Sequence, residues 1–314
     1  MNALLPHAHL DLLDRPLLAA LTTQMPDGRL QSTVVWCGRD GDQVLLNTMR
    51  EFQKARNMQA RPRATVLVLD PDDATRWLEV RGGVVPDEYD PVARLDELGR
   101  TYTGKAPYFG EVVPAELSAV EHPVGFRLVP TRVCTGPGPA QREQAIPDPS
   151  PQRPPAREAS SAETSPAPVP RGCDGEARIP DSHRALLQRP LPGALSTRLP
   201  DGAAQTHPVW FGLDGNDVLV NTTLERRKGR NLVADPRATL LVVDPDDGSR
   251  WLEIRGDVEL VQDGALDHLD ELTRRYTSHA RYYGRIRPAG QRRLETRVIA
   301  RIHPQRVVAD AVHA

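Results

Sequence analysis

One stretch of the chain carries cations and hydroxyl groups where an apolar strand is expected to lead into a helix. The stretch is Asn221–Asn231, and the apolar run Asp217–Val220 precedes it. A helix that begins near Glu225 would offer free backbone N–H groups and the positive end of its dipole to an anion. Arginine forks, a lysine charge and hydroxyl donors are the groups that a phosphate needs. The stretch therefore predicts a phosphate-binding site.

The same arrangement occurs earlier in the chain, at Asn47–Asn57. A shift of 174 residues (221 minus 47) aligns the two stretches, and 30 of the 48 positions in 35–82 are identical to those in 209–256. An isolated cluster of this kind is more often a solvated basic face of a helix. Because the cluster recurs with its threonine and asparagine retained, we favour the phosphate site.

The repeat covers two whole domains rather than a short solenoid unit. We expect domains at 1–135 and 181–314, joined by a disordered linker at 136–180 that is rich in Pro, Ala, Ser, Glu and Arg. Two similar domains in one chain predict a fused homodimer, packed within the molecule around a pseudo-two-fold axis. Two separate domains that never touch are the alternative.

Composition excludes several classes of protein. The 314 residues carry a formal net charge of -2, which does not favour binding to nucleic acid. The three cysteines have neither an even count nor metal-type spacing, so we expect no disulfide framework and no metal site. Acidic turns such as Asp70–Asp73 are interpreted as tight turns. Charges interrupt the apolar start of the chain, which predicts no signal peptide, no membrane span and a cytoplasmic location.

The pattern of apolar runs predicts a mainly β fold with helical insertions in each domain. Pro-Asp-Gly and Asp-Gly turns indicate an antiparallel meander at its start. The expected strands of the first domain are 16–23, 30–37, 43–47, 64–70, 76–85 and 124–133, with helices at 9–14, 51–60 and 90–103. Those of the second domain are 193–197, 205–211, 217–221, 238–244, 250–260 and 298–307. Six strands with two or three helices predict a small barrel in each half.

An ordered series of motifs resembles the pyridoxamine-phosphate-oxidase-like split β-barrel family, and within it the branch that binds the deazaflavin coenzyme F420. The resemblance covers both domains. It rests on Pro208–Phe211, Val218–Thr222, Arg226–Leu232, Asp235–Arg237 and Ile254–Gly256. It implies two packed split barrels with cofactor clefts at their interface, where one barrel holds the phosphate and the other walls the ring.

The resemblance also implies which residues bind the cofactor. In the second domain they are Thr222, Arg226 and Lys228, followed by Arg230 and Asn231, with Trp210 near the cleft or in the barrel wall. The matching set in the first domain is Thr48, Lys54, Arg56 and Asn57. Phe52 departs from the pattern because the family has arginine there, and Arg50 is a possible substitute. We therefore expect the second-domain site to be the competent one.

The implied activity is an F420H2-dependent oxidoreductase that passes hydride between the deazaflavin and a small organic substrate. An FMN-dependent enzyme of the pyridoxamine-phosphate-oxidase type is one alternative, and a non-catalytic flavin, F420 or heme binder is another. No catalytic side chain is assigned, although Tyr282 and Tyr283 are candidates to face the substrate. Glu79 and Arg81 alternate with apolar residues and predict a cross-strand ion pair, repeated at Glu253 and Arg255.

Overall fold

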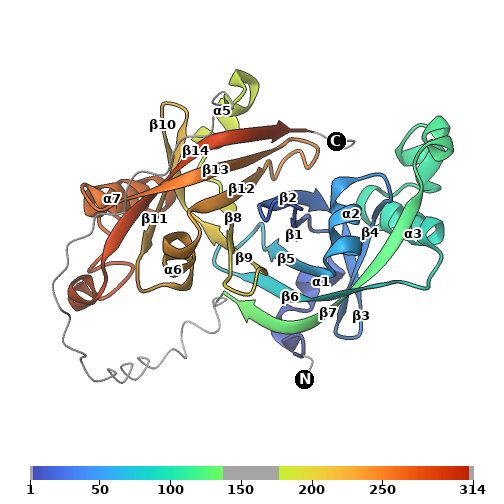
Figure 1. Ribbon diagram of the computed structural model, residues 1–314, viewed down its shortest axis with the longest axis horizontal. Coiled ribbons are helices and arrows are strands. Elements are labelled where there is room, and N and C mark those ends of the chain that lie inside the picture. The colour runs from blue at the N-terminus through green and yellow to red at the C-terminus, as the bar shows by residue number, and fades with distance from the viewer. Residues whose placement is uncertain (1–2, 137–176, 311–314) are drawn as a thin grey trace.

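The computed structural model describes residues 3–136 and 177–310. They form two antiparallel sheets of seven strands, one from each half of the chain, which lie side by side in Figure 1. The first sheet has the order β2-β1-β5-β6-β7-β4-β3 and the second has the order β10-β11-β14-β13-β12-β8-β9. The strands of the first are β1 (Ala19–Gln24), β2 (Leu30–Val35), β3 (Cys37–Asp40), β4 (Gln43–Met49), β5 (Arg63–Leu69), β6 (Trp77–Pro86) and β7 (Pro123–Thr135). Those of the second are β8 (Gly193–Arg198), β9 (Ala204–Val209), β10 (Phe211–Asp214), β11 (Asp217–Thr223), β12 (Arg237–Val243), β13 (Trp251–Val261) and β14 (Arg297–Ala309).

Helices occupy the connections between the strands. They are α1 (Asp11–Asp14), α2 (Gln53–Ala60), α3 (Pro91–Thr103), α5 (Asp181–Gln188), α6 (Arg227–Ala234) and α7 (Ala265–Tyr276), with short turns η1 (His7–His9), η2 (Tyr108–Val112), η3 (Ala115–Ala119) and η4 (Ala289–Leu294). Local residues fix both ends of α3. At its start the Asp90 carboxylate accepts the Val92 N–H at 2.9 Å, and at its end Gly104 adopts the left-handed conformation with φ of 75°. Figure 1 shows α3 and α7 at opposite ends of the molecule.

Each half contains seven strands, not the six expected from the sequence. The expected strand 30–37 breaks at Trp36 into β2 and β3, which lie at opposite edges of one sheet. A single residue can join opposite edges only if the sheet curls until those edges meet, which is the geometry of a split barrel. The Tyr102 hydroxyl fixes the break, since it accepts the Cys37 N–H at 3.1 Å and lies 2.9 Å from the Leu17 carbonyl oxygen. Trp210 and Tyr276 repeat this arrangement in the second sheet.

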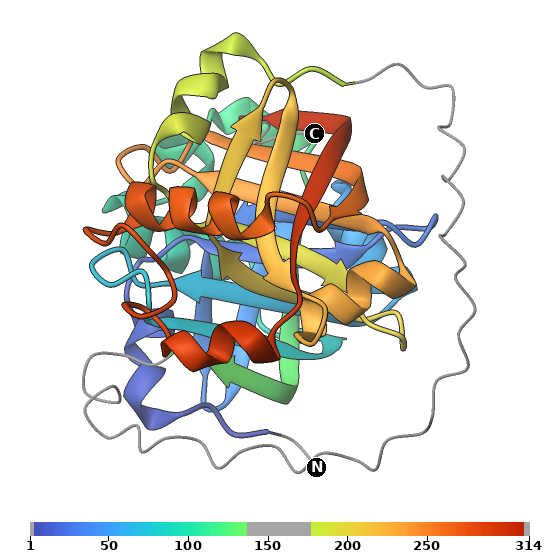
Figure 2. The same ribbon diagram turned by 90° about the vertical axis from the view of Figure 1, so that its left-hand side faces the viewer.

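The two barrels pack against each other around a pseudo-two-fold axis. The Thr65 hydroxyl of β5 donates to the Ala204 carbonyl oxygen at 2.8 Å, and its counterpart Thr239 of β12 donates to Leu30 at 2.7 Å. Each barrel also has its own apolar core. A third apolar cluster joins the barrels and contains Ala20, Leu67, Ala194, Leu241 and Trp251. Figure 2 shows the second barrel, with α6 and α7, in front of the first.

Beside this cluster, four hydroxyl groups lie together on the axis, two from each barrel. They belong to Thr22, Ser32, Ser196 and Thr206, and the hydrogen bonds among them are 2.9 to 3.0 Å long. Because all four side chains are buried, the hydroxyls satisfy one another where no water reaches them.

Most of the expected linker, at 137–176, lies outside the described residues. The described end of this segment packs against the second barrel. The Ala177 N–H bonds to the Pro304 carbonyl oxygen at 3.2 Å, and the Ile179 side chain is buried. Among the helices in the described parts, none combines the length and apolar character that crossing a membrane requires.

Candidate functional site

The predicted phosphate site lies where β11 ends and α6 begins. Thr222 is the penultimate residue of β11, Arg226 is the N-cap of α6, and Lys228 is in its first turn. No side chain caps this helix, so the N–H groups of its first turn have no partner of that kind. The equivalent site at β4 and α2 contains a cavity, and we call it the first cleft. By this equivalence we call the site at β11 and α6, with the residues around it, the second cleft.

Buried polar atoms without partners occur at matching positions in both clefts. Among the described residues, the Thr222 hydroxyl and His207 Nδ1 have no hydrogen-bond partner in the second cleft. The hydroxyls of Thr48 and Thr33, their equivalents 174 residues earlier, have none in the first. Orphaned buried groups cost stability unless a ligand or water satisfies them. Their recurrence shows that both sites keep unsatisfied polar atoms at matching positions.

A charged network holds the arginine of the second cleft in place. Arg226 and Arg297 share the carboxylate of Glu295, at 3.4 Å and 2.7 Å. The Tyr283 hydroxyl donates to the same carboxylate and accepts the Arg297 Nε–H at 2.8 Å. Burial acts to raise the pKa of Glu295, but the bond from Tyr283 and the two guanidinium groups hold it below the usual range. The carboxylate is therefore charged and orients both arginines.

Lys228 adds a further cation to this cleft. Burial, together with the nearby Arg226 and Arg297, lowers the pKa of its amine to about 8, while Glu79 of the first barrel acts to raise it. Lys228 has no ion-pair partner in the described parts of the chain. With Arg226 and Arg297 set against Glu295, these side chains carry two unbalanced positive charges, which suits an anionic phosphate group.

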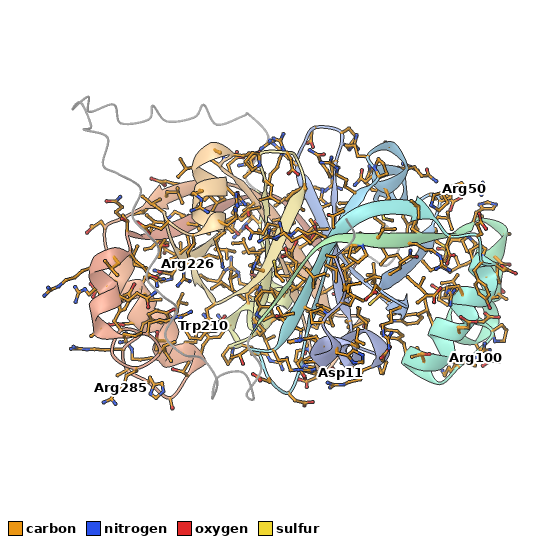
Figure 3. All side chains as sticks on the ribbon, turned by 90° about the horizontal axis from the view of Figure 1, so that it is seen from below. Asp11, Arg50, Arg100, Trp210, Arg226 and Arg285 are labelled. Atoms are coloured by element: carbon orange, nitrogen blue, oxygen red, sulfur yellow. The ribbon has the colours of Figure 1, made fainter. Side chains whose placement is uncertain are left out.

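Aromatic rings from both barrels wall the second cleft. Trp210 stacks on Tyr276 with ring centres 5.4 Å apart and meets the edge of Tyr282 at 6.5 Å. Trp77 of the first barrel lies edge-on to His207 at 5.0 Å. Burial, with Lys228 and Arg81, lowers the pKa of His207 to about 3, so its ring is neutral at physiological pH. Figure 3 shows Trp210 and Arg226 on the same barrel.

The first cleft contains a cavity of about 460 Å³. Its lining includes Trp36, Thr48, Phe52 and Lys54, with Trp251 from the second barrel. The expected substitute for the missing arginine, Arg50, does not line it: Arg50 is exposed, at the outer end of the first barrel in Figure 3. This cleft therefore keeps the lysine and threonine of the pattern but has no arginine in the family position.

Four other predicted site residues occupy different surroundings. The side-chain amide of Asn231 is buried and donates to Thr197 and Gln205, and Asn57 makes the same two bonds in the first barrel. Both asparagines attach their helix to the sheet. Arg56 and Arg230 are exposed, and Arg230 Nη1 donates to the Glu225 carbonyl oxygen. The two asparagines therefore lie on the sheet side of their helices and Arg230 lies on the outer face. Arg56 is exposed but lines a hollow of about 210 Å³ with Phe52, Lys54 and Trp251.

The sequence analysis did not identify Glu295 and Arg297, the charged residues that pair next to Arg226. The signal was present, because the aligned residues of the first domain are Glu121 and Pro123, so the repeat keeps the acid and changes the base. The Glu79–Arg81 and Glu253–Arg255 ion pairs do form, at 3.2 Å and 2.6 Å, but within one strand rather than across two.

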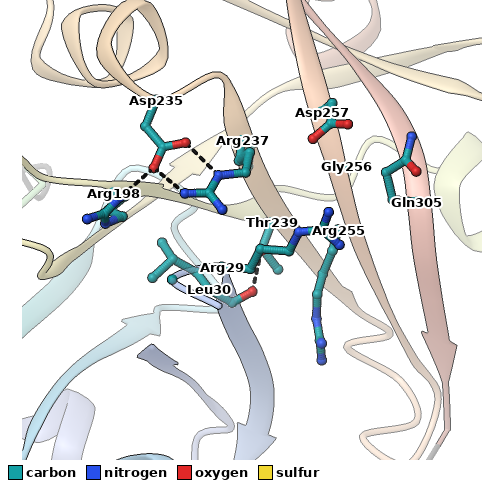
Figure 4. Close-up of a pocket in the computed structure, with 12 residues that line it drawn as sticks. Arg29, Leu30, Arg198, Asp235, Arg237, Thr239, Arg255, Gly256, Asp257 and Gln305 are labelled. Atoms are coloured by element: carbon teal, nitrogen blue, oxygen red, sulfur yellow. Dashed lines mark hydrogen bonds and ion pairs between the residues drawn. The ribbon is translucent and has the colours of Figure 1, made fainter. Parts of the chain in front are cut away.

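Another hollow at the barrel interface is structural. Figure 4 shows Asp235 paired with Arg198 and Arg237, at 3.0 Å and 2.7 Å, beside the bond from Thr239 to Leu30. The cavity there is about 20 Å³, which is room for a single water molecule. Across residues 3–136 and 177–310, no cluster of three or more His, Cys, Asp or Glu side chains could hold a metal ion.

These features define a fused pair of split β-barrels with an equivalent polar site in each half. The chain belongs to the pyridoxamine 5'-phosphate oxidase family, whose model matches it twice, over residues 5–124 and 179–309. The second match spans all seven strands of the second barrel, and the first covers the first barrel as far as the start of β7.

Solved structures of similar proteins each cover less than half of the chain. An F420 reductase is 35% identical, over 41% of this chain and 98% of its own, with a TM-score of 0.37. A conserved hypothetical protein from Mycobacterium tuberculosis is 23% identical, over 45% and 89%, with a TM-score of 0.34. The heme storage protein HutZ from Vibrio cholerae is 16% identical, over 43% and 96%, with a TM-score of 0.32. No curated protein matches the sequence.

Proposed function

We propose that the protein is an oxidoreductase that anchors the phosphate of a deazaflavin, F420, in the second cleft and reduces a small organic substrate. The observation that carries the proposal is the group of cations around the unpartnered Thr222 hydroxyl at the start of α6. Arg226, Lys228 and the helix N-terminus supply charge and donors of the kind that bind phosphate groups. The resemblance to the F420-binding branch supports F420 as the cofactor.

The residues of this chain bind and orient the cofactor. Arg226 would contact the phosphate while Glu295 fixes its guanidinium, and Lys228 would add a second charge from the same helix. Trp210 and Tyr282 from one barrel, and Trp77 from the other, provide an apolar wall that can exclude water from a ring. When bound, the deazaflavin supplies the hydride.

We assign Tyr282, which lies in this aromatic wall, as the proton donor to the substrate. Burial acts to raise the pKa of its hydroxyl, but the charge and hydrogen bond of Arg226, together with Arg297, bring the pKa below its ordinary value. The hydroxyl is therefore a stronger acid than a free phenol. It can donate a proton to a substrate that accepts hydride.

An FMN-dependent reaction is the second candidate, because the anchor contacts only the phosphate and fits a flavin equally well. Calorimetric titration of the purified chain with F420 and with FMN separates the two. We expect one F420 per chain, with a dissociation constant raised about ten- to hundredfold by Arg226→Ala or Lys228→Met. Tight FMN binding without F420 binding would replace the first proposal by the second.

Turnover decides between an enzyme and a binding protein. Reduced F420 is mixed with the protein and a panel of enones and imines, and the oxidised cofactor is followed by absorbance. We expect oxidation that depends on substrate and is lost with Arg226→Ala. Stoichiometric binding with no oxidation across the panel would favour a non-catalytic carrier.

A further inference from the structure

The two clefts differ at three positions that act together. Where the second cleft has Arg226, Tyr283 and Arg297, the first has Phe52, Phe109 and Pro123. All three replacements exchange a charged or hydroxyl-bearing side chain for an apolar one. The first cleft thereby lacks the two guanidinium groups that shape the second.

Aromatic rings surround the cavity that remains. Trp36 stacks on Tyr102 with ring centres 5.1 Å apart and meets the edge of Tyr108 at 6.2 Å. Phe52 and Trp251 complete the ring-lined wall, and Trp251 comes from the second barrel. The volume of about 460 Å³ lies within the range of small-molecule sites. The cavity therefore suits a planar ligand that stacks between rings.

One cation, two orphaned hydroxyls and the orphaned side-chain oxygen of Asn47 give this cavity its polarity. An adjoining hollow shares Thr33, Phe52, Lys54 and Trp251 with it and is also lined by Arg56, Arg255 and Arg306. Among the described residues, Lys54 is the only charged one that lines the cavity itself. Its amine lies 5.4 Å from the centre of the Phe52 ring, and burial lowers its pKa to about 8. Glu121, which stands where the other cleft has Glu295, does not line the cavity. The hydroxyls of Thr48 and Thr33 have no partner in the described parts of the chain.

We propose that the first cleft is a second ligand site, specialised for a planar aromatic molecule that carries a single carboxylate. Lys54 balances one negative charge, and the hydroxyls of Thr48 and Thr33 can donate to carboxylate oxygens. The rings of Trp36, Phe52 and Trp251 cover the apolar body. A doubly charged phosphate is less favoured here than in the second cleft, because the cavity has no counterpart of Arg226 or Arg297. The proposal is independent of the cofactor in the second cleft.

The test compares three probes on the full chain by isothermal titration calorimetry. They are 1-naphthoate, its neutral analogue 1-naphthamide, and sulfate. We expect one 1-naphthoate per chain, with 1-naphthamide weaker by about ten- to hundredfold because the charge-assisted contact is absent. Lys54→Met should weaken 1-naphthoate to the level of the amide. The matched variant Lys228→Met, at the equivalent position of the other cleft, should leave 1-naphthoate unchanged and weaken sulfate.

A gain-of-function variant provides a readout that does not depend on losing a contact. Phe52→Arg should weaken 1-naphthoate and add a second sulfate per chain, because it restores the family arginine. Equal affinity for 1-naphthoate and 1-naphthamide in the unmodified chain would overturn the proposal. So would competition between sulfate and 1-naphthoate for one site, or 1-naphthoate binding that depends on Lys228 rather than Lys54.

Discussion

The hydroxyls of Thr22 and Ser196 share a hydrogen bond of 3.0 Å across the axis that relates the two barrels. These residues are equivalent, since 22 plus 174 equals 196. A bond between equivalent atoms can form only on or beside a two-fold axis. The bond therefore locates the axis at the middle of the hydroxyl cluster, with one ligand cleft on either side.

The buried carboxylate of Glu253 is expected to be important for holding the barrels together. It accepts the Ser32 N–H of the other barrel at 2.6 Å and pairs with Arg255, and its side chain is 1% exposed. Glu253→Ala leaves a buried guanidinium and a backbone N–H without their partner. We expect a loss of about 3–5 kcal/mol in the free energy of unfolding, measured by urea denaturation. Glu259→Ala, on the exposed part of the same strand, is the control and should change stability little.

Arg226 and Lys228 should control the binding of simple anions as well as of the cofactor. Replacing either by an uncharged residue is expected to weaken sulfate binding about ten- to hundredfold, because a charge-assisted contact is lost. Calorimetry on the full chain measures this effect. Arg230→Ala, which removes an exposed cation from the same helix, should leave the affinity nearly unchanged. Equal losses in all three variants would show that only the overall charge of the helix matters.

Sulfate binding in the second cleft should weaken as the pH rises through about 8. The amine of Lys228 has a lowered pKa of about 8, so it is charged below that pH and neutral above it. Sulfate stays a dianion across this range, and a change in affinity therefore reports the protein. Above the pKa, the charged fraction falls about tenfold for each pH unit. A Lys228→Met chain should show a flat profile between about pH 6 and about pH 9.5; a retained slope would assign the titration to another group.

Gly229 is expected to set the distance between α6 and the end of β11. A β-carbon at this position would lie 2.0 Å from the Thr223 carbonyl oxygen, whereas the first barrel carries a buried alanine, Ala55, at the equivalent position. Gly229→Ala should therefore displace the helix, destabilise the protein by about 1–3 kcal/mol and weaken sulfate binding. Thermal denaturation and calorimetry measure the two effects. Ala55→Gly is the matched change, and it should lower stability without altering sulfate affinity.

The repeat made much of the fold predictable from the sequence, because the residues that indicate each turn and strand occur in both copies. The Pro-Asp-Gly hairpins were correct: Gly28 and Gly202 adopt φ of 83° and 84°, a conformation that glycine favours. The break at Trp36 was not predictable in this way. Apolar character runs through that residue without interruption, and only the closing of the sheet decides that β2 and β3 separate there.

Some of the predicted site residues could be located from local spacing, and others could not because their positions depend on tertiary packing. Thr222, Arg226 and Lys228 fall at a strand end and a helix start, positions that spacing alone can locate. Asn231 looked similar in sequence, yet its side-chain amide is buried against the sheet, where Thr197 and Gln205 accept its hydrogen bonds. Arg297 lies in β14, far along the chain, so no local pattern associates it with the site, and only the comparison of the two repeats, in which Pro123 stands at its position, could have indicated it.

The covalent fusion of the barrels has a consequence for how the clefts can differ. In a homodimer, a change from arginine to phenylalanine enters both clefts at once, because both are encoded by the same codon. Here Phe52 and Arg226 are separate codons, although their barrels still share one interface. Each cleft also takes a wall from the other barrel, Trp77 on one side and Trp251 on the other. Single-chain symmetry thus allows the two clefts to be mutated, assayed and engineered independently.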